Sequence, residues 1–423
     1  KPKKEDITIR EGLAIVAFWW MFCALFGALP YWFSGTCDTF CDSYFESMSG
    51  LTTTGASIFS DIEALPHGIL FWRSMTQWLG GMGIVVFFVA ILPTIGVGGH
   101  KLFSAEAPDL TTDKIKPRIA QTAKILWVIY LSLTAILIPF LWFGGMEFFD
   151  AVCHSFTTVS TGGFSTKNQS IAAFDSLFIE IVIMVFAFIA GCNFILYYQL
   201  VTGKFKKVLA NSEIRFFVSL MLCAICLITL ALFFFDSTSY NGGVKDHKYD
   251  SVGGSLRYAA FQAVSIMTSA GYCNADFDLW PDFCRVFLVL LMFIGGCAGS
   301  TAGGMKVARI MLLCKSGVRE LFHVLRPRAI MHVKLSGKPV SEDIITNTLG
   351  FIVINLGLFG VFSLILTIFG TELITSFSSI ASMMSNVGPA LADAGATKNY
   401  SGFASPCKWV LAFSMLVGRL EKK

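Results

Sequence analysis

Apolar runs of about 20 residues recur along this 423-residue chain, and they restrict its fold more than any other feature. A helix of that length crosses a hydrocarbon core about 30 Å thick. The hydropathy pattern predicts eight crossings, at about residues 12–30, 68–95, 120–143, 175–200, 214–235, 283–314, 344–369 and from 408 onward. The chain is therefore predicted to be an all-α polytopic membrane protein.

The composition argues against the main soluble classes. Hydrophobic residues make up 55% of the chain and charged residues only 14%, whereas a soluble domain has about 25% charged residues. We therefore exclude a soluble enzyme, a disordered protein and a nucleic-acid-binding protein. The 12 cysteines show no spacing typical of a zinc site, and no cofactor is expected. Cys37 and Cys41, in an expected outer loop, are compatible with a disulfide or with free thiols.

Alternate connecting segments differ in their basic residues. One set carries 21 Lys and Arg and the other set carries 7; the basic set comprises residues 1–12, 96–124, 202–215 and 306–345. By the positive-inside rule, the basic set and with it the N-terminus are expected to be cytoplasmic. The opposite face is acidic, which would raise the local cation concentration at a pore mouth, although solvated outer loops explain it equally well.

An internal repeat organises these crossings. Paired apolar runs are separated by a Ser/Thr/Met-rich stretch, such as 40–54 or 258–269, that is too short to cross and leads to a glycine. The four glycines, Gly55, Gly163, Gly271 and Gly388, lie 108, 108 and 117 residues apart. We predict four units of helix, re-entrant half-helix, glycine loop and helix around one pore within a single chain. Their expected limits are 1–95, 96–202, 203–317 with a broken second helix, and 344–423, with a cytoplasmic basic linker at 318–343.

The glycine loops are predicted to form a selectivity filter. Glycine tolerates the backbone angles that point carbonyl oxygens toward an ion, and the half-helix C-termini add partial negative charge. The loops contain no carboxylate, which favours a monovalent cation over Ca²⁺ or Mg²⁺. The expected ion-binding residues are Thr53, Thr54, Gly55, Thr161, Gly162, Gly163, Ser269, Ala270, Gly271, Asn386, Val387 and Gly388.

A glycine-rich segment interrupts the sixth run. Five glycines in ten residues disfavour a straight helix, so the segment is a candidate gate beneath the filter, although close helix packing is the alternative. Its residues are Gly295, Gly296, Gly299, Ser300, Thr301, Gly303 and Gly304. Arg419, inside the last run, is expected to face the pore as part of the gate, unless it is an ordinary cytoplasmic anchor.

Three further charged residues have expected roles outside the filter. Arg73 and Arg285 lie at the outer ends of their runs and are expected to be interfacial anchors. Glu46 begins the first half-helix where the other units have His154, Gln262 or Ser379, which suggests an orienting or capping role. His154 with its nearby serines also raises an intramembrane hydrolase as an alternative, but the variation at this position disfavours it.

Several motifs resemble the TrkH family, the membrane subunits of bacterial Trk potassium-uptake systems, related to KtrB and the plant HKT transporters. These are Ser47–Ala56, Gly80–Gly83 with Ile91–Pro93, Gly96–Gly99, Pro117–Ala120, Arg319–Asp343 and Gly418–Glu421. The resemblance implies four filter loops arranged as in a potassium channel, with the four glycines lining a K⁺ filter. In plant relatives a serine at the first filter glycine goes with Na⁺ transport, so glycine at position 55 favours K⁺. It also implies an intramembrane gating loop at 295–304 and an arginine, Arg419, that projects into the pore.

The same resemblance implies partners and a location. The family forms homodimers in the cell (inner) membrane and binds a cytosolic, nucleotide-binding TrkA-type regulatory subunit, for which the basic loops are candidate docking sites. Family members usually carry an extra helix pair before the first unit and a longer final helix, so the chain is expected to be truncated. A Na⁺- or H⁺-coupled K⁺ symporter of the same fold remains the alternative to a passive pathway.

Overall fold

The computed structural model describes residues 9–83, 119–234, 249, 251–327, 331–335 and 338–420. In these residues the only strands are two-residue elements, β1 (Lys334–Leu335) and β2 (Lys338–Pro339), which pair antiparallel. The remaining elements are helices, which confirms the all-α prediction. The second half of the expected 68–95 crossing, the loop at 96–118 and residues 421–423 lie outside the described ranges.

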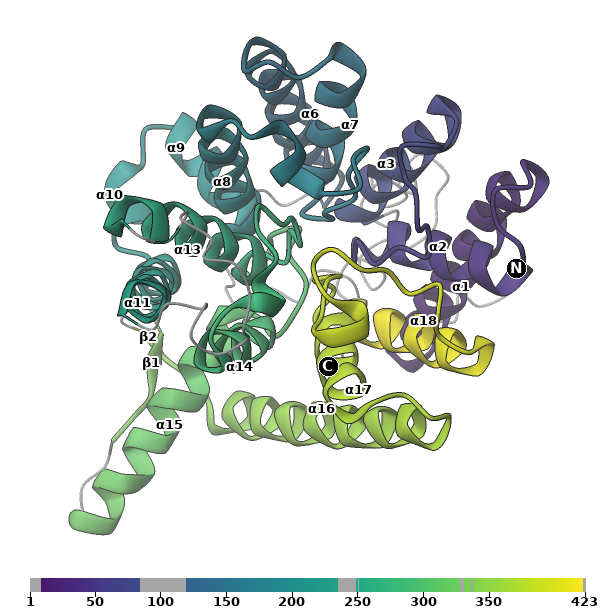
Figure 1. The fold of residues 1–423 in the computed structure, drawn as a ribbon. Coiled ribbons are helices and arrows are strands. Elements are labelled where there is room, and N and C mark those ends of the chain that lie inside the picture. The colour runs from purple at the N-terminus through teal and green to yellow at the C-terminus, as the bar shows by residue number, and fades with distance from the viewer. Residues whose placement is uncertain are drawn as a thin grey trace, which may run out of the picture.

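Four sets of helices follow one another around a centre, from purple to yellow in Figure 1. Each set contains a long first helix and a short second helix. The first two sets are α1 (Ile9–Phe33), α2 (Phe40–Leu51) and α3 (His67–Gly81), then α6 (Ile119–Phe143), α7 (Phe148–Val159), α8 (Leu177–Gly191), α9 (Phe194–Val201) and α10 (Phe205–Leu209). The last two are α11 (Ser212–Phe234), α13 (Val252–Met267), α14 (Asp282–Met292) and α15 (Val307–Leu325), then α16 (Glu342–Ile368), α17 (Leu373–Met384) and α18 (Ser405–Arg419).

The ring of helices closes on itself. The contacts run from α3 to α7, from α8 to α13, from α14 to α17, and from α18 back to α2. Short 3₁₀ helices lie on the chain between a half-helix and the helix that follows it, before α8, α14 and α18: η1 (Ser170–Phe174), η3 (Phe277–Leu279) and η4 (Ala392–Ala394). The half-helices therefore lie inside the ring, where their C-terminal ends can meet.

The first helix of each set is long and apolar enough to cross a membrane. These four spans are Ala14–Phe33, Lys124–Phe143, Ser212–Phe234 and Glu342–Ile368, and the bent pair α8 and α9 would make a fifth. The 12 residues of α2, α7 and α17 extend only about 18 Å, at about 1.5 Å per residue, so these helices cannot cross. The third half-helix, α13, begins at Val252, six residues before the expected start at Tyr258.

One crossing that was expected to be a single straight helix is broken and bent. Residues 175–200 were predicted as one span, but α8 ends at Gly191 and α9 leaves it at 96°. The side chain of Asn193 caps α9 by accepting a hydrogen bond from the N–H of Ile195, and the carbonyl of Gly191 accepts one from the N–H of Cys297. Because partners outside the helix satisfy these groups, the break is tolerated at membrane depth.

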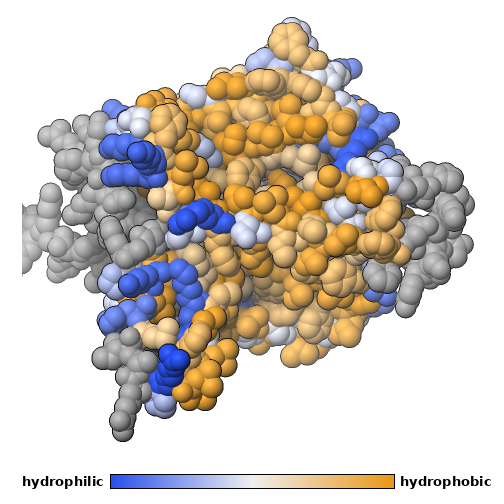
Figure 2. Space-filling model, turned by 90° about the vertical axis from the view of Figure 1, so that its left-hand side faces the viewer, coloured by the Kyte–Doolittle hydropathy of each residue, from blue (hydrophilic) through white to orange (hydrophobic). Residues whose placement is uncertain are grey.

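The surface and the interior reverse the pattern of a soluble protein. Figure 2 shows a broad hydrophobic face, and large side chains such as Phe18, Phe26 and Val353 are more than half exposed on the outer helices. The half-helices, in contrast, bury many hydroxyl groups, including those of Ser49, Thr157 and Ser265. An apolar outer surface with a polar interior fits a chain that lipid surrounds.

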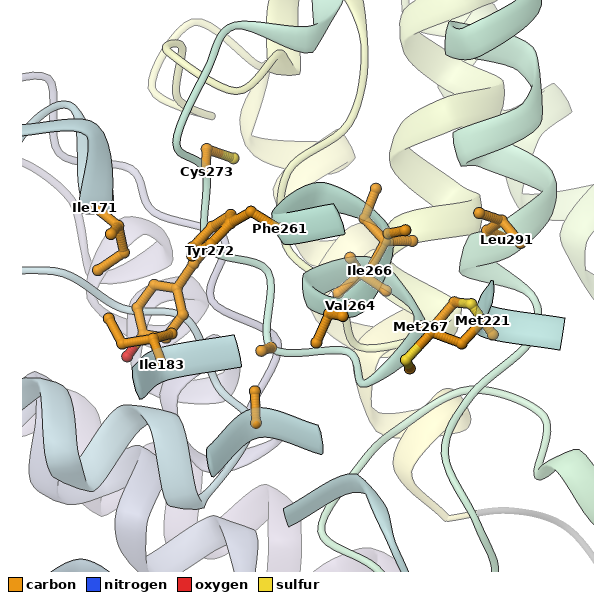
Figure 3. Close-up of a cluster of buried hydrophobic side chains, with 14 of the residues drawn as sticks. Ile171, Ile183, Met221, Phe261, Val264, Ile266, Met267, Tyr272, Cys273 and Leu291 are labelled. Atoms are coloured by element: carbon orange, nitrogen blue, oxygen red, sulfur yellow. The ribbon is translucent and has the colours of Figure 1, made fainter. Parts of the chain in front are cut away.

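Two hydrophobic cores flank the centre. One joins the second and third sets, and Figure 3 shows part of it around Ile183, Phe261 and Tyr272. The other joins the first and last sets, around Trp20, Phe45 and Met415. The chain thus packs as two halves, and the polar loops lie where the halves meet.

A buried ion pair closes the ring between the last set and the first. The ammonium of Lys408 on α18 lies 2.6 Å from a carboxylate oxygen of Asp42 on α2, and the other carboxylate oxygen accepts a 2.7 Å hydrogen bond from Thr39. Both charged side chains are largely buried.

We expect Lys408→Met to destabilise the fold by about 3 kcal/mol, because it leaves the buried Asp42 carboxylate without an opposite charge. The additional change Asp42→Asn should recover most of that loss. The thermal midpoint of the purified protein in detergent measures both effects. An unchanged midpoint for Lys408→Met would contradict the role assigned to this pair.

Candidate functional site

Four glycine loops follow the half-helices at equivalent positions. We call residues 52–55, 160–163, 268–271 and 385–388 glycine loops 1 to 4. In each loop the glycine is the fourth residue after the last residue of its half-helix. The regular placement gives all four loops the same relation to a helix C-terminus, where the helix dipole leaves partial negative charge.

Each half-helix ends in the same backbone motif. In loop 1 the N–H of Thr53 bonds to the carbonyl of Gly50, and the N–H of Thr54 bonds to the carbonyl of Ser49. Loops 2, 3 and 4 repeat both bonds. This pattern is a Schellman cap, which usually places glycine in the left-handed position.

Here other residues occupy that left-handed position. The φ angles are 55° at Thr53, 55° at Thr161, 52° at Ser269 and 52° at Asn386. Such a conformation costs about 1–3 kcal/mol for a non-glycine residue and tends to mark functional sites. Two residues later the glycines return to positive φ, at 83° for Gly55, 79° for Gly163, 70° for Gly271 and 104° for Gly388.

The loops touch one another in a closed ring. A methyl group added to Gly55 would collide with the carbonyl oxygen of Gly162 in loop 2. The same holds from loop 2 to loop 3, from loop 3 to loop 4 and from loop 4 back to loop 1. The four carbonyls are those of Thr54, Gly162, Ala270 and Val387. Each glycine is therefore required both by its φ and by the approach of the next loop.

The ring has two different sides. On one side the four glycines line a single cavity together with the residues that follow them, among them Ser57, Ser165 and Tyr400. At the edge of this cavity Asn168 donates a 2.9 Å hydrogen bond to Asp61, which lowers the pKa of the Asp61 carboxyl. Asp61 therefore stays ionised to a lower pH and keeps negative charge near the cavity. The half-helix ends and the 295–304 segment lie on the other side.

Arg73 is not an interfacial anchor, contrary to expectation. Its side chain is only 1% exposed, and its Nε lies 2.8 Å from a carboxylate oxygen of Glu46. It also donates to the carbonyl of Ser165 at 3.0 Å, while Glu46 accepts from the N–H of Ile58 at 2.9 Å. This pair therefore holds the chain that leaves loops 1 and 2, which fits the orienting role expected of Glu46. Arg285 instead pairs with Asp278 and Asp282 and is partly exposed.

His154 supports its loop as Glu46 supports loop 1. One ring nitrogen, Nε2, lies 2.9 Å from the hydroxyl of Ser165, and the other, Nδ1, lies 2.8 Å from the backbone carbonyl of Asp150. The hydrogen bonds of the imidazole go to these two groups, and the Asp150 carboxylate instead accepts one from Thr166. The contacts therefore describe a structural support rather than a nucleophile activated by a base and a carboxylate. Cys37 and Cys41 are free thiols in the structure.

Other side chains that hold the loops were missed from the sequence. The hydroxyl of Tyr272 lies 2.5 Å from that of Thr157, and Tyr400 donates to the carbonyl of Gly388 at 3.0 Å. Asn386, in contrast, was among the expected ion-binding residues, and its amide donates to Thr54 at 3.0 Å. Gln77 on α3 bonds to loop 2. A polar residue inside an apolar run, such as Gln77, is the one signal that could have pointed to them.

The 295–304 segment lies against the half-helix ends. The N–H of Gly303 donates to the hydroxyl of Ser269 at 2.6 Å, and the hydroxyl of Thr301 donates to the carbonyl of Val159 at 3.2 Å. The segment also bonds to the break between α8 and α9, through Cys297 and Gly299. Gly299 is exposed and Ser300 half-buried. The segment thus contacts loops 2, 3 and 4 through Thr301 and Gly303.

Arg419 connects three of these features. Its guanidinium donates to the hydroxyl of Thr53 at 3.2 Å, to the carbonyl of Thr301 at 3.0 Å and to the carbonyl of Gly80 at 2.7 Å. Loop 1, the 295–304 segment and the end of α3 therefore meet at one cation. The carbonyl oxygens stabilise this charge where water is scarce.

Comparisons with known proteins agree with this architecture. The family model TrkH, described as cation transport protein, matches residues 1–422. The chain is 42% identical to the Trk system potassium uptake protein TrkH of Salmonella typhimurium, over 100% of this chain and 85% of that protein. It is 34% identical to the Trk system potassium uptake protein TrkG of Escherichia coli, over 99% of this chain and 84% of that one.

A solved structure matches over the same extent. The crystal structure of the potassium transporter TrkH from Vibrio parahaemolyticus superposes with a TM-score of 0.84 at 38% identity, covering 100% of this chain and 85% of that one. The helical membrane fold is therefore shared, and the family is one of transporters rather than enzymes. With its family model matched along almost the whole length, the chain belongs to the TrkH family of cation transport proteins.

Proposed function

We propose that this protein mediates potassium uptake across the cell (inner) membrane through a selectivity filter formed by the four glycine loops. The ring of carbonyls from Thr54, Gly162, Ala270 and Val387 carries the proposal. Each belongs to a loop at a helix C-terminus, and carbonyl oxygens there favour a cation. The relatives reported above are named potassium uptake proteins. The filter comprises residues 53–55, 161–163, 269–271 and 386–388.

The gate in this proposal is the 295–304 segment together with Arg419. The segment lies beside the half-helix ends, and Arg419 bonds to both loop 1 and Thr301. A cation fixed beside a cation pathway opposes the passage of K⁺ through Coulomb repulsion. Movement of the segment would change the position of Arg419, because the two share a hydrogen bond.

The wider assembly is proposed from the family and the charge pattern. The protein would work as a homodimer with its N-terminus in the cytoplasm, and a cytosolic nucleotide-binding TrkA-type subunit would dock on the basic loops and the linker 318–343. The units 1–95, 96–202, 203–317 and 344–423 would surround one pore. A Na⁺- or H⁺-coupled symporter of the same fold is the second candidate, which collapse of the Na⁺ and proton gradients distinguishes from a passive pathway.

The filter is tested by substitution of its first glycine. We expect Gly55→Ser to lower the K⁺/Na⁺ selectivity of radioactive Rb⁺ uptake into liposomes by about tenfold, because a side chain at positive φ costs about 1–2 kcal/mol and meets the carbonyl of Gly162. Gly163→Ser should act similarly. Gly68→Ser, at an open position on α3, is the matched control. Wild-type selectivity in both filter variants would refute the filter.

The gate is tested by removal of its charge. We expect Arg419→Ala to raise Rb⁺ flux in the absence of a partner by about tenfold, because a charge-assisted hydrogen bond contributes about 1.5 kcal/mol or more. Arg419→Lys keeps the charge and should give a smaller increase. Deletion of Gly299 and Ser300 tests the segment independently. If neither Arg419→Ala nor this deletion changes the flux, the gate is misassigned.

A further inference from the structure

Glycine loop 2 differs from the other three at one position. The residue before the last glycine carries a side chain in loops 1, 3 and 4, namely Thr54, Ala270 and Val387, but loop 2 has Gly162. Gly162 has no positive φ, so its backbone conformation does not require a glycine. The absence of a side chain at position 162 must therefore be explained by the residues around it.

Gln77 occupies the space of the missing side chain. A methyl group added to Gly162 would overlap the side-chain amide of Gln77, which reaches loop 2 from α3 of the first set. The Gln77 side chain is fully buried. Loop 2 is thus completed by a side chain from the neighbouring set of helices rather than by its own.

The amide of Gln77 binds both sides of Gly163. Its Nε2 donates to the carbonyl of Gly162 at 2.6 Å, and its Oε1 accepts from the N–H of Phe164 at 3.0 Å. The partners fix the orientation of the amide, because a carbonyl can only accept and an N–H can only donate. The filter glycine of loop 2 is therefore held between two hydrogen bonds to one side chain.

At the positions equivalent to Gln77, the helices that follow half-helices 2 and 4 have no side-chain amide. Gln77 lies four residues before Gly81, which packs on the first residue of loop 2, Ser160. In the next set the residue at the same spacing is Ala187, because Gly191 packs on the first residue of loop 3, Thr268. In the last set, Met415 precedes Gly418 by three residues, as Gln77 precedes Gly80. Within the described ranges, the carbonyls of the ring residues in loops 1, 3 and 4 accept no side-chain hydrogen bond, unlike that of Gly162.

We propose that Gln77 is a specificity-determining residue that positions glycine loop 2 and makes one of the four ring carbonyls a weaker cation ligand than the others. A carbonyl oxygen has two lone pairs, and the bond from Gln77 occupies one at Gly162. The same bond resists rotation of that peptide, so the ring keeps a fixed size on this side. The inference rests on the proposed filter, since it concerns the ligands that the filter presents.

The first test separates the two hydrogen bonds. Gln77→Met keeps the volume and removes both bonds, whereas Gln77→Glu keeps an acceptor for Phe164 and loses the donor to Gly162. We expect Gln77→Glu, which loses one hydrogen bond, to change the K⁺/Na⁺ selectivity of Rb⁺ uptake into liposomes by about threefold to tenfold. Gln77→Met, which loses both, should change it at least as much. Ser74→Ala is the matched control, because the buried Ser74 hydroxyl donates to the carbonyl of Leu70 in α3 rather than to a glycine loop.

The second test restores the packing. Gly162→Ala alone should reduce Rb⁺ flux strongly because of the overlap with Gln77. The double variant Gly162→Ala with Gln77→Ala should recover flux, because it reproduces the combination of Ala270 and Ala187 found one unit later. A double variant as impaired as Gly162→Ala would overturn the packing argument.

Failure of the inference differs from failure of the proposed function. Wild-type liposomes without cation flux would contradict the proposed function and the inference with it. Normal wild-type flux, together with unchanged selectivity in both Gln77→Met and Gln77→Glu, would overturn the inference alone. Elution as a single species and an unchanged thermal midpoint show that each variant is folded, so a shifted ratio then reports on the loop.

Discussion

The close contact of four glycines with the carbonyl groups of the next loop is the constraint on which the rest of the structure depends. Each contact leaves no room for a side chain, and each brings the C-terminal end of one half-helix toward the next. The half-helices can meet only because the long first helices form an outer ring and exclude lipid. Buried polar side chains, including Glu46 and Arg73, then form the hydrogen bonds to the backbone around the loops that water would otherwise form.

The four equivalent loops could be predicted from the sequence because their geometry requires a particular residue, glycine, at each of four positions. The spacing of Gly55, Gly163 and Gly271 indicated equivalent loops, since only glycine meets both the φ and the approach. Partners across the fold could not be predicted, because hydropathy says nothing about which helices adjoin. Arg73 was therefore assigned to the interface, and Gln77 was overlooked. The bend after Gly191 was missed because apolar residues continue through it, although Asn193 is a typical helix N-cap.

The loops have the same backbone geometry, but different side chains support them. Loop 1 is held by a carboxylate and a guanidinium, loop 2 by an imidazole and an amide, and loop 4 by an asparagine and a tyrosine. The common element is the backbone, with its Schellman caps and positive φ angles. Different side chains around one backbone geometry allow each ring carbonyl to differ in strength as a ligand while the ring keeps its shape.

The central claim is that the four carbonyls form a cation site, and anomalous diffraction from crystals soaked in Rb⁺ or Tl⁺ tests it most directly. Both ions substitute for K⁺ and scatter strongly enough to be located. The account predicts an anomalous peak on the axis of the ring, within coordination distance of the carbonyl oxygens of Thr54, Gly162, Ala270 and Val387. Peaks confined to other positions, or a ring without any ion at saturating concentration, would contradict it.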